Sequence, residues 1–250
     1  MKTNLKIYLA PLLMLFSVIV QGQDVEDIIR RSEQNLRGVS SHTEMTIRIV
    51  RPTWERSISA ESWSEGSENS MILIHEPARD RGTVFLKREQ EMWNYVPTIN
   101  RSVKMPPSMM SQSWMGSDFN NDDLVRESSM ITDYTHTLLG RETIRGKECF
   151  VIESIPNDDA PVVWGKLKSY ITTDNYLQWK VEFYDEDDLV VQTMEGFNPR
   201  QFDGRTLPSK MRMTPADVDG EFTEMTYESL EFGVDFQNNF FTVQNMRRLR

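Results

Sequence analysis

From residue 43 onwards, the chain alternates apolar and polar residues with a period of two. Residues 45–49 and 179–183 are the clearest examples. This period predicts β-strands with one buried face and one face in water. Turn-forming pairs separate such runs at Arg81-Gly82, Arg145-Gly146, Asp203-Gly204 and Asp219-Gly220. Because no long helical pattern lies between the runs, the sequence predicts an antiparallel meander of about ten strands rather than β-α-β units.

One amphipathic helix is expected before the first strand. Four apolar residues there follow helical spacing: Val25, Ile28, Ile29 and Leu36. Asp24 is a typical N-terminal cap, and Gly38 is a typical stop. We therefore expect a helix between these two residues, with its apolar side packed against another element.

Residues 1–23 have the pattern of a signal peptide. Lys2 and Lys6 precede an apolar stretch over residues 7–20. Gly22, a small residue typical of a cleavage site, follows this stretch. The alternative is an uncleaved anchor, but about 14 apolar residues are fewer than the roughly 20 that span a bilayer. We expect cleavage near Gly22 or Gln23 and one domain over residues 24–250.

The mature protein is expected to be soluble outside the cytoplasm. Its only cysteine, Cys149, lies far from the cleavage point, so lipid attachment there is not expected. Loss of Lys2 and Lys6 leaves 26 basic and 38 acidic residues, a net charge of −12. Such a charge argues against nucleic acid as a partner.

The sequence does not predict an enzyme, a cofactor or a metal site. His42, His75 and His136 are far apart, and no nucleotide-binding or nucleophile motif accompanies them. Cys149 lies in an apolar strand pattern with one nearby cation, which indicates a small core residue rather than a reactive thiol. The cluster of Asp118, Asp122 and Asp123 lacks the ligand pattern of an EF-hand, and helix capping explains it more simply.

A methionine-rich segment interrupts the meander between residues 105 and 130. It carries five of the 15 methionines, among serine residues that suit an exposed loop. Methionine is flexible and polarizable, so it packs against apolar ligands of variable shape, but it also fills gaps in ordinary cores. The segment can therefore be a lid over an apolar site or a part of the ordinary core. The nearby aromatic residues can likewise belong to a ligand site or to the core.

Under the first of these two interpretations, eight residues form the candidate ligand site. The expected residues of the lid or cavity mouth are Met105, Met109, Met110, Trp114 and Met115. The expected lining residues are Trp93, Tyr95 and Phe119.

Several segments together resemble the outer-membrane lipoprotein-sorting proteins of the LolA-like superfamily. The most telling is the G-S-D-F-x-x-x-D-L element over residues 116–124, which follows a W-x-Y-x-P element over residues 93–97. Residues 170–185 and 239–242 are also similar to that family, and the resemblance extends from about Val25 to Leu249.

The resemblance implies an incomplete β-barrel, a strongly curved antiparallel sheet whose concave side is covered by helices. It also implies a periplasmic carrier for lipid or lipoprotein acyl chains, with an inner-membrane exporter of RND or ABC type and an outer-membrane acceptor as possible partners. The known carriers have an Arg-Pro pair where this chain has Glu76-Pro77, so their lid mechanism is not carried over. The alternative is a docking subunit of an exporter or envelope complex that has no cargo of its own.

Overall fold

The structure is a computed structural model that describes residues 24–249 except 90, 127–129, 159 and 161. The expected signal peptide lies outside the described residues. Thirteen strands occur in the described part of the chain: β1 Ser40–Arg51, β2 Trp54–Glu65, β3 Asn69–Glu76, β4 Val84–Arg88, β5 Glu91–Val96, β6 Arg101–Lys104, β7 Tyr134–Ile144, β8 Lys147–Pro156, β9 Lys166–Thr172, β10 Gln178–Tyr184, β11 Val190–Phe202, β12 Arg205–Pro215 and β13 Phe222–Phe232.

The helical elements are few and mostly short. They are α1 Val25–Arg37, η1 Pro97–Ile99, η2 Pro107–Met109, η3 Asp122–Arg126, α2 Met130–Asp133 and α3 Val243–Met246. None of the helices in the described residues is long and apolar enough to cross a membrane.

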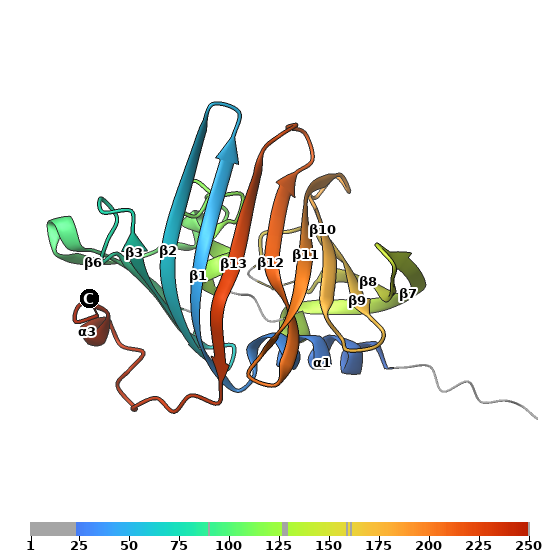
Figure 1. Cartoon of the computed structure of the whole chain (residues 1–250), viewed down its shortest axis with the longest axis horizontal. Coiled ribbons are helices and arrows are strands. Elements are labelled where there is room, and N and C mark those ends of the chain that lie inside the picture. Colours follow the sequence, from blue (N-terminus) through green and yellow to red (C-terminus); the bar gives the residue numbers. More distant parts are fainter. Residues whose placement is uncertain (1–23, 90, 127–129, 159, 161, 250) are drawn as a thin grey trace, which may run out of the picture.

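All thirteen strands form one antiparallel sheet that does not close into a barrel, which confirms the expected half-open architecture (Figure 1). The count exceeds the expected ten partly because a strand as short and exposed as β6 shows no alternation in the sequence. The strand order is β6-β5-β4-β3-β2-β1-β13-β12-β11-β10-β9-β8-β7. The first and last strands therefore pair at the centre, and the sheet extends outwards from them in two halves.

This topology places β6 and β7, which are consecutive in the sequence, at opposite edges of the sheet. The described residues of the link between them, 105–126 and 130–133, lie over the open side, and we call them the crossing segment. The sheet face that it covers is the inner face. The crossing segment packs into the largest apolar cluster of the protein, where Trp114 is fully buried and contacts Phe85 at 5.5 Å between ring centroids.

Helix α1 covers the inner face of the C-terminal half of the sheet, where it lies across the strand ends (Figure 1). The Asp24 carboxylate accepts a hydrogen bond from the Glu26 backbone at 3.1 Å, and the helix ends at Gly38, as expected. Ile28 and Ile29 are buried against Phe150, Ile152 and Ile171. Burial of one apolar side, rather than propensity alone, stabilises a helix of this length.

Strands β3 and β4 are buried on both faces. In β3, Ile72 and Ile74 face the inner cluster, whereas Met71 and Leu73 face outwards. The outward residues are covered by residues 233–249, which we call the C-terminal segment. Its packing residues are Phe236, Phe240, Phe241, Val243, Met246 and Leu249.

Two arginines hold the crossing segment to the end of the β1–β2 hairpin. Arg51 binds the Asp118 carboxylate through two hydrogen bonds of 2.9 and 3.1 Å, and the Thr223 hydroxyl donates to the same carboxylate at 2.6 Å. Arg56 donates to the Met115 carbonyl at 2.7 Å. The Arg51 and Asp118 side chains are only 13% and 8% exposed, so this pair is largely desolvated.

We expect Arg51→Ala to lower the free energy of unfolding by about 3 kcal/mol, because it leaves the buried Asp118 carboxylate without its cation. Urea unfolding followed by tryptophan fluorescence measures the loss. The matched control is Arg48→Ala, which breaks the bidentate but exposed pair with Glu55. Exposed pairs contribute little, so equal losses for both variants would contradict a special role for Arg51.

Candidate ligand-binding cavity

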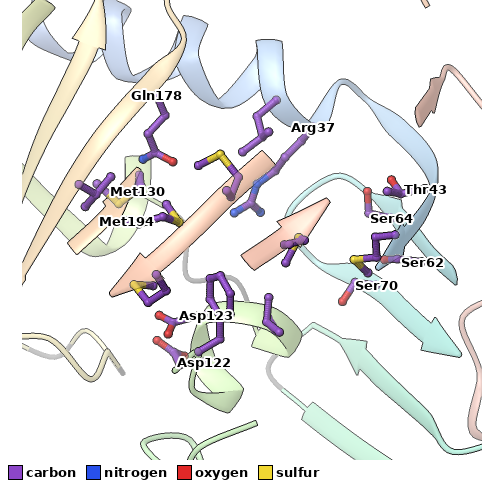
Figure 2. Close-up of a pocket in the computed structure, with 18 of the residues that line it drawn as sticks. Arg37, Thr43, Ser62, Ser64, Ser70, Asp122, Asp123, Met130, Gln178 and Met194 are labelled. Atoms are coloured by element: carbon purple, nitrogen blue, oxygen red, sulfur yellow. The ribbon is translucent and has the colours of Figure 1, made fainter. Parts of the chain in front are cut away.

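A cavity of about 250 Å³ lies between the inner face of the sheet, the crossing segment and the end of α1 (Figure 2). Strands from both halves of the sheet line it. Its apolar wall includes Met45, Ile72, Leu167, Val181, Phe183 and Leu230. The crossing segment contributes Phe119, Leu124 and Met130. The cavity exists where two curved halves of the sheet and a crossing chain meet, which is a common place for a small-molecule site.

Four methionines form a patch on three neighbouring strands of the cavity wall. Met194 on β11 pairs with Met213 on β12, and Met211 on β12 pairs with Met225 on β13. None of these four methionines is among the eight residues expected to form the site. The signal that could have identified Met211 and Met213 is their spacing of two, which puts both on one face.

One end of the cavity is polar. Ser41, Thr43, Ser62, Ser64 and Ser70 line it from β1, β2 and β3, and Arg37 lies at the end of α1 (Figure 2). The hydroxyls of Ser41 and Ser64 are hydrogen-bonded to one another at 2.8 Å. No motif in the sequence pointed to these residues, because single serines and threonines are common in strands.

The crossing segment brings Asp122 and Asp123 to the cavity wall (Figure 2). Burial raises the pKa of the Asp123 carboxyl to about 7, and hydrogen bonds from the Asn120 backbone and the Trp164 indole oppose this rise. These bonds are 2.9 and 3.1 Å long. The Asn120 side chain in turn accepts from the Asp123 backbone at 2.7 Å. The capping role expected for this region therefore belongs to Asn120, whereas Asp118 binds Arg51.

Of the eight residues selected from the sequence, Phe119 lines the cavity. Met105, Met110 and Trp114 are buried in the same apolar cluster, and Met109 and Met115 are half-buried against it. The crossing segment thus lies beside the cavity. Most of its large side chains pack beside the cavity rather than in its wall.

Trp93 and Tyr95 lie on the outer face of the sheet and do not line the cavity. They pair with Leu86 and Val84 in the cluster under the C-terminal segment. On β5 the buried apolar residue of the inner face is Met92. Alternation correctly places Trp93 and Tyr95 on one face, but it does not say which of two buried faces bounds the cavity.

The other titratable residues considered in the sequence lie outside the cavity. His42 and His75 share the Glu61 carboxylate, at 2.6 and 3.0 Å, although they are 33 positions apart. His136 contacts Ser154 and the Met130 carbonyl. No group of three potential metal ligands occurs among the residues that the structure describes.

Cys149 is fully buried on the outer face, in a cluster with Val151, Tyr170 and Trp179. Burial raises the pKa of its thiol to about 11. It is therefore a protonated thiol at neutral pH, which agrees with the core role expected for it.

The raised pKa of Asp123 predicts a stability that depends on pH. The folded state holds the proton up to about pH 7, whereas the unfolded chain releases it near pH 4. The contribution of Asp123 to the free energy of unfolding is therefore complete at low pH and is lost as the pH rises. The difference in unfolding free energy between wild type and Asp123→Asn should fall by about 1.4 kcal/mol per pH unit across this window. Urea unfolding at several pH values measures it.

The matched control is Asp217→Asn, which changes an exposed carboxyl in a turn. Its difference from wild type should stay nearly constant across the window. A constant difference for Asp123→Asn as well would show that this carboxyl does not take up a proton on folding.

A comparison with protein-family models gave a match over residues 66–248, to a family described as "Uncharacterized protein". No curated protein matched. Three solved structures match most of the chain. The first, a DUF1329 family protein from Desulfovibrio piger, is 22% identical with a TM-score of 0.80, and the match covers 88% of this chain and 97% of that one.

The second is described as an outer membrane lipoprotein-sorting protein domain from Vibrio parahaemolyticus, with 23% identity, a TM-score of 0.79 and coverage of 89% of this chain and 98% of that one. The third is a LolA superfamily protein from Nitrosomonas europaea, with 24% identity, a TM-score of 0.75 and coverage of 88% and 97%. These structures show a shared fold. They confirm the fold implied by the resemblance to the LolA-like superfamily, and the match over residues 66–248 shows that the chain belongs to the family of that model.

Proposed function

We propose that this protein is a periplasmic carrier that binds lipid, or the acyl chains of a lipoprotein, in the cavity and carries them between the inner and outer membranes. The observation that supports this proposal most directly is the methionine-lined cavity between the open sheet and the crossing segment. Binding is noncovalent and no reaction is catalysed. The signal peptide expected from the sequence is consistent with the proposed location.

The affinity of such a site comes from burial of apolar surface. Each methylene removed from water contributes about 0.8 kcal/mol, so six of them contribute roughly 5 kcal/mol. The methionine patch suits chains that differ in shape, because its side chains can change rotamer at little cost. Affinity without strict shape requirements is what a carrier needs, since it must also release its cargo.

The crossing segment acts as the lid in this proposal. Arg51 and Arg56 hold residues 115–118 of this lid. Met109 and Met115 are half-buried at the edge of the apolar cluster, so they are the lid residues best placed to meet an entering chain. An exporter in the inner membrane and an acceptor in the outer membrane would supply and remove the cargo.

Mass spectrometry of organic extracts tests the proposal. The mature protein is purified from the native periplasm without detergent, and a stoichiometric lipid in the extract would support a carrier and identify its class of cargo. A folded protein that carries no lipid would contradict the carrier function and favour a docking subunit with no cargo of its own.

We expect Met194→Trp to weaken the binding of an apolar fluorescent probe at least ten-fold, because the larger side chain fills the cavity. Met194 is half-buried and lines the wall (Figure 2). The matched control is Thr193→Trp, since the preceding residue faces the outer side of the same strand. Fluorescence titration measures both variants, and equal probe binding in the two would exclude this cavity as the binding site.

A further inference from the structure

Hydroxyl groups occupy two successive rows of the inner face at one end of the cavity. Antiparallel pairing aligns Ser41, Ser64 and Ser70 across β1, β2 and β3. In the next row it aligns Thr43 with Ser62, and this row continues to the apolar Ile72 on β3. The third row, formed by Met45, Ala60 and Ile74, is apolar. Ser41, Thr43 and Ser70 are each less than 9% exposed. Buried polar side chains on an otherwise apolar face indicate more about its function than buried apolar side chains do. Burial of a polar group without a hydrogen bond costs free energy.

The hydroxyl rows and the methionine patch line different parts of the same cavity, and Gln178, Asp122 and Asp123 lie on the side of Met194 (Figure 2). A purely hydrocarbon ligand would leave hydroxyl groups against methylene groups at one end. A ligand with one apolar chain and one hydrogen-bonding head group would match both ends. A few placed polar groups in an apolar pocket commonly fix the orientation of a ligand.

Charges of both signs line this cavity. Arg37 extends from the end of α1, whereas Asp122 and Asp123 lie on the wall formed by the crossing segment (Figure 2). An anionic head group would be attracted by the first and repelled by the other two. An uncharged head group that carries hydroxyls can accept from the guanidinium and can both donate to and accept from the serines.

The volume limits the number of chains. At about 250 Å³ the cavity is smaller than the roughly 300–1,000 Å³ of sites that enclose drug-sized ligands. It accommodates one acyl chain rather than several side by side.

On the basis of the carrier function above, we propose that the cavity takes a single-chain amphiphile with an uncharged, hydroxyl-bearing head group, of the monoacylglycerol type. The head group lies against the two hydroxyl rows beside Arg37, and the acyl chain lies along the methionine patch. The hydroxyl rows thus select the head group, while the methionines tolerate different chains.

Calorimetric titration with chain-matched ligands tests this proposal. The mature protein is titrated at about pH 8 with monodecanoylglycerol, decanoate and didecanoylglycerol. We expect monodecanoylglycerol to bind at least ten-fold more tightly than either of the others. The double variant Thr43→Val/Ser62→Ala should lose about ten-fold in affinity for monodecanoylglycerol, which corresponds to the loss of two hydrogen bonds.

The chain offers a matched control on the opposite face. Thr46 and Ser59 are also a cross-strand pair of β1 and β2, but they face outwards. Thr46→Val/Ser59→Ala therefore removes the same two hydroxyls without touching the cavity and should leave binding unchanged. An apolar fluorescent probe should bind the wild type and both double variants equally, because it has no head group to lose.

The outcomes separate this inference from the carrier function. Tighter binding of decanoate or didecanoylglycerol, or unchanged binding in Thr43→Val/Ser62→Ala, would overturn the proposed head group while leaving the carrier function intact. If neither the three ligands nor the apolar probe bind to the folded wild type, the carrier function fails and this inference fails with it.

Discussion

The pairing of β1 with β13 is the constraint on which the rest of the molecule depends. It joins the two halves of the sheet at the centre, so that β6 and β7 become opposite edges. The chain between these edges has to pass over the open side of the sheet. Because that chain is rich in methionine and carries Trp114, its passage creates an apolar interior, and the cavity lies where this interior is incompletely filled.

The polar contacts around Asp118 hold that passage in place. Arg51 and Thr223 come from the strands that form the central pair, so the crossing segment is bound where the two halves of the sheet meet. A carboxylate that is largely desolvated is stable only with such partners. The family element around Asp118 can thus be understood physically as the attachment point of the segment that covers the inner face.

Local patterns in the sequence predicted the parts of the structure that local physics determines. The helix between Asp24 and Gly38 followed from its cap, its apolar spacing and its stop, and the antiparallel sheet followed from alternation. Contacts such as that between Arg51 and Asp118 join residues 67 positions apart, and no local pattern indicates them. The same holds for Trp93 and Tyr95, because the C-terminal segment buries the outer face of β5 and makes both faces of that strand apolar.

The C-terminal segment gives the sheet an unequal thickness. Around β3 and β4 the protein has three layers, namely the crossing segment, the sheet and the aromatic cover of residues 233–249. Around β10 and β12 the outer face carries ion pairs, such as Lys180 with Glu182 and Lys210 with Glu224. A sheet that is packed on both faces bends less easily than a sheet that is packed on one face. The sheet around β3 and β4 therefore has less freedom to bend than the sheet around β10 and β12.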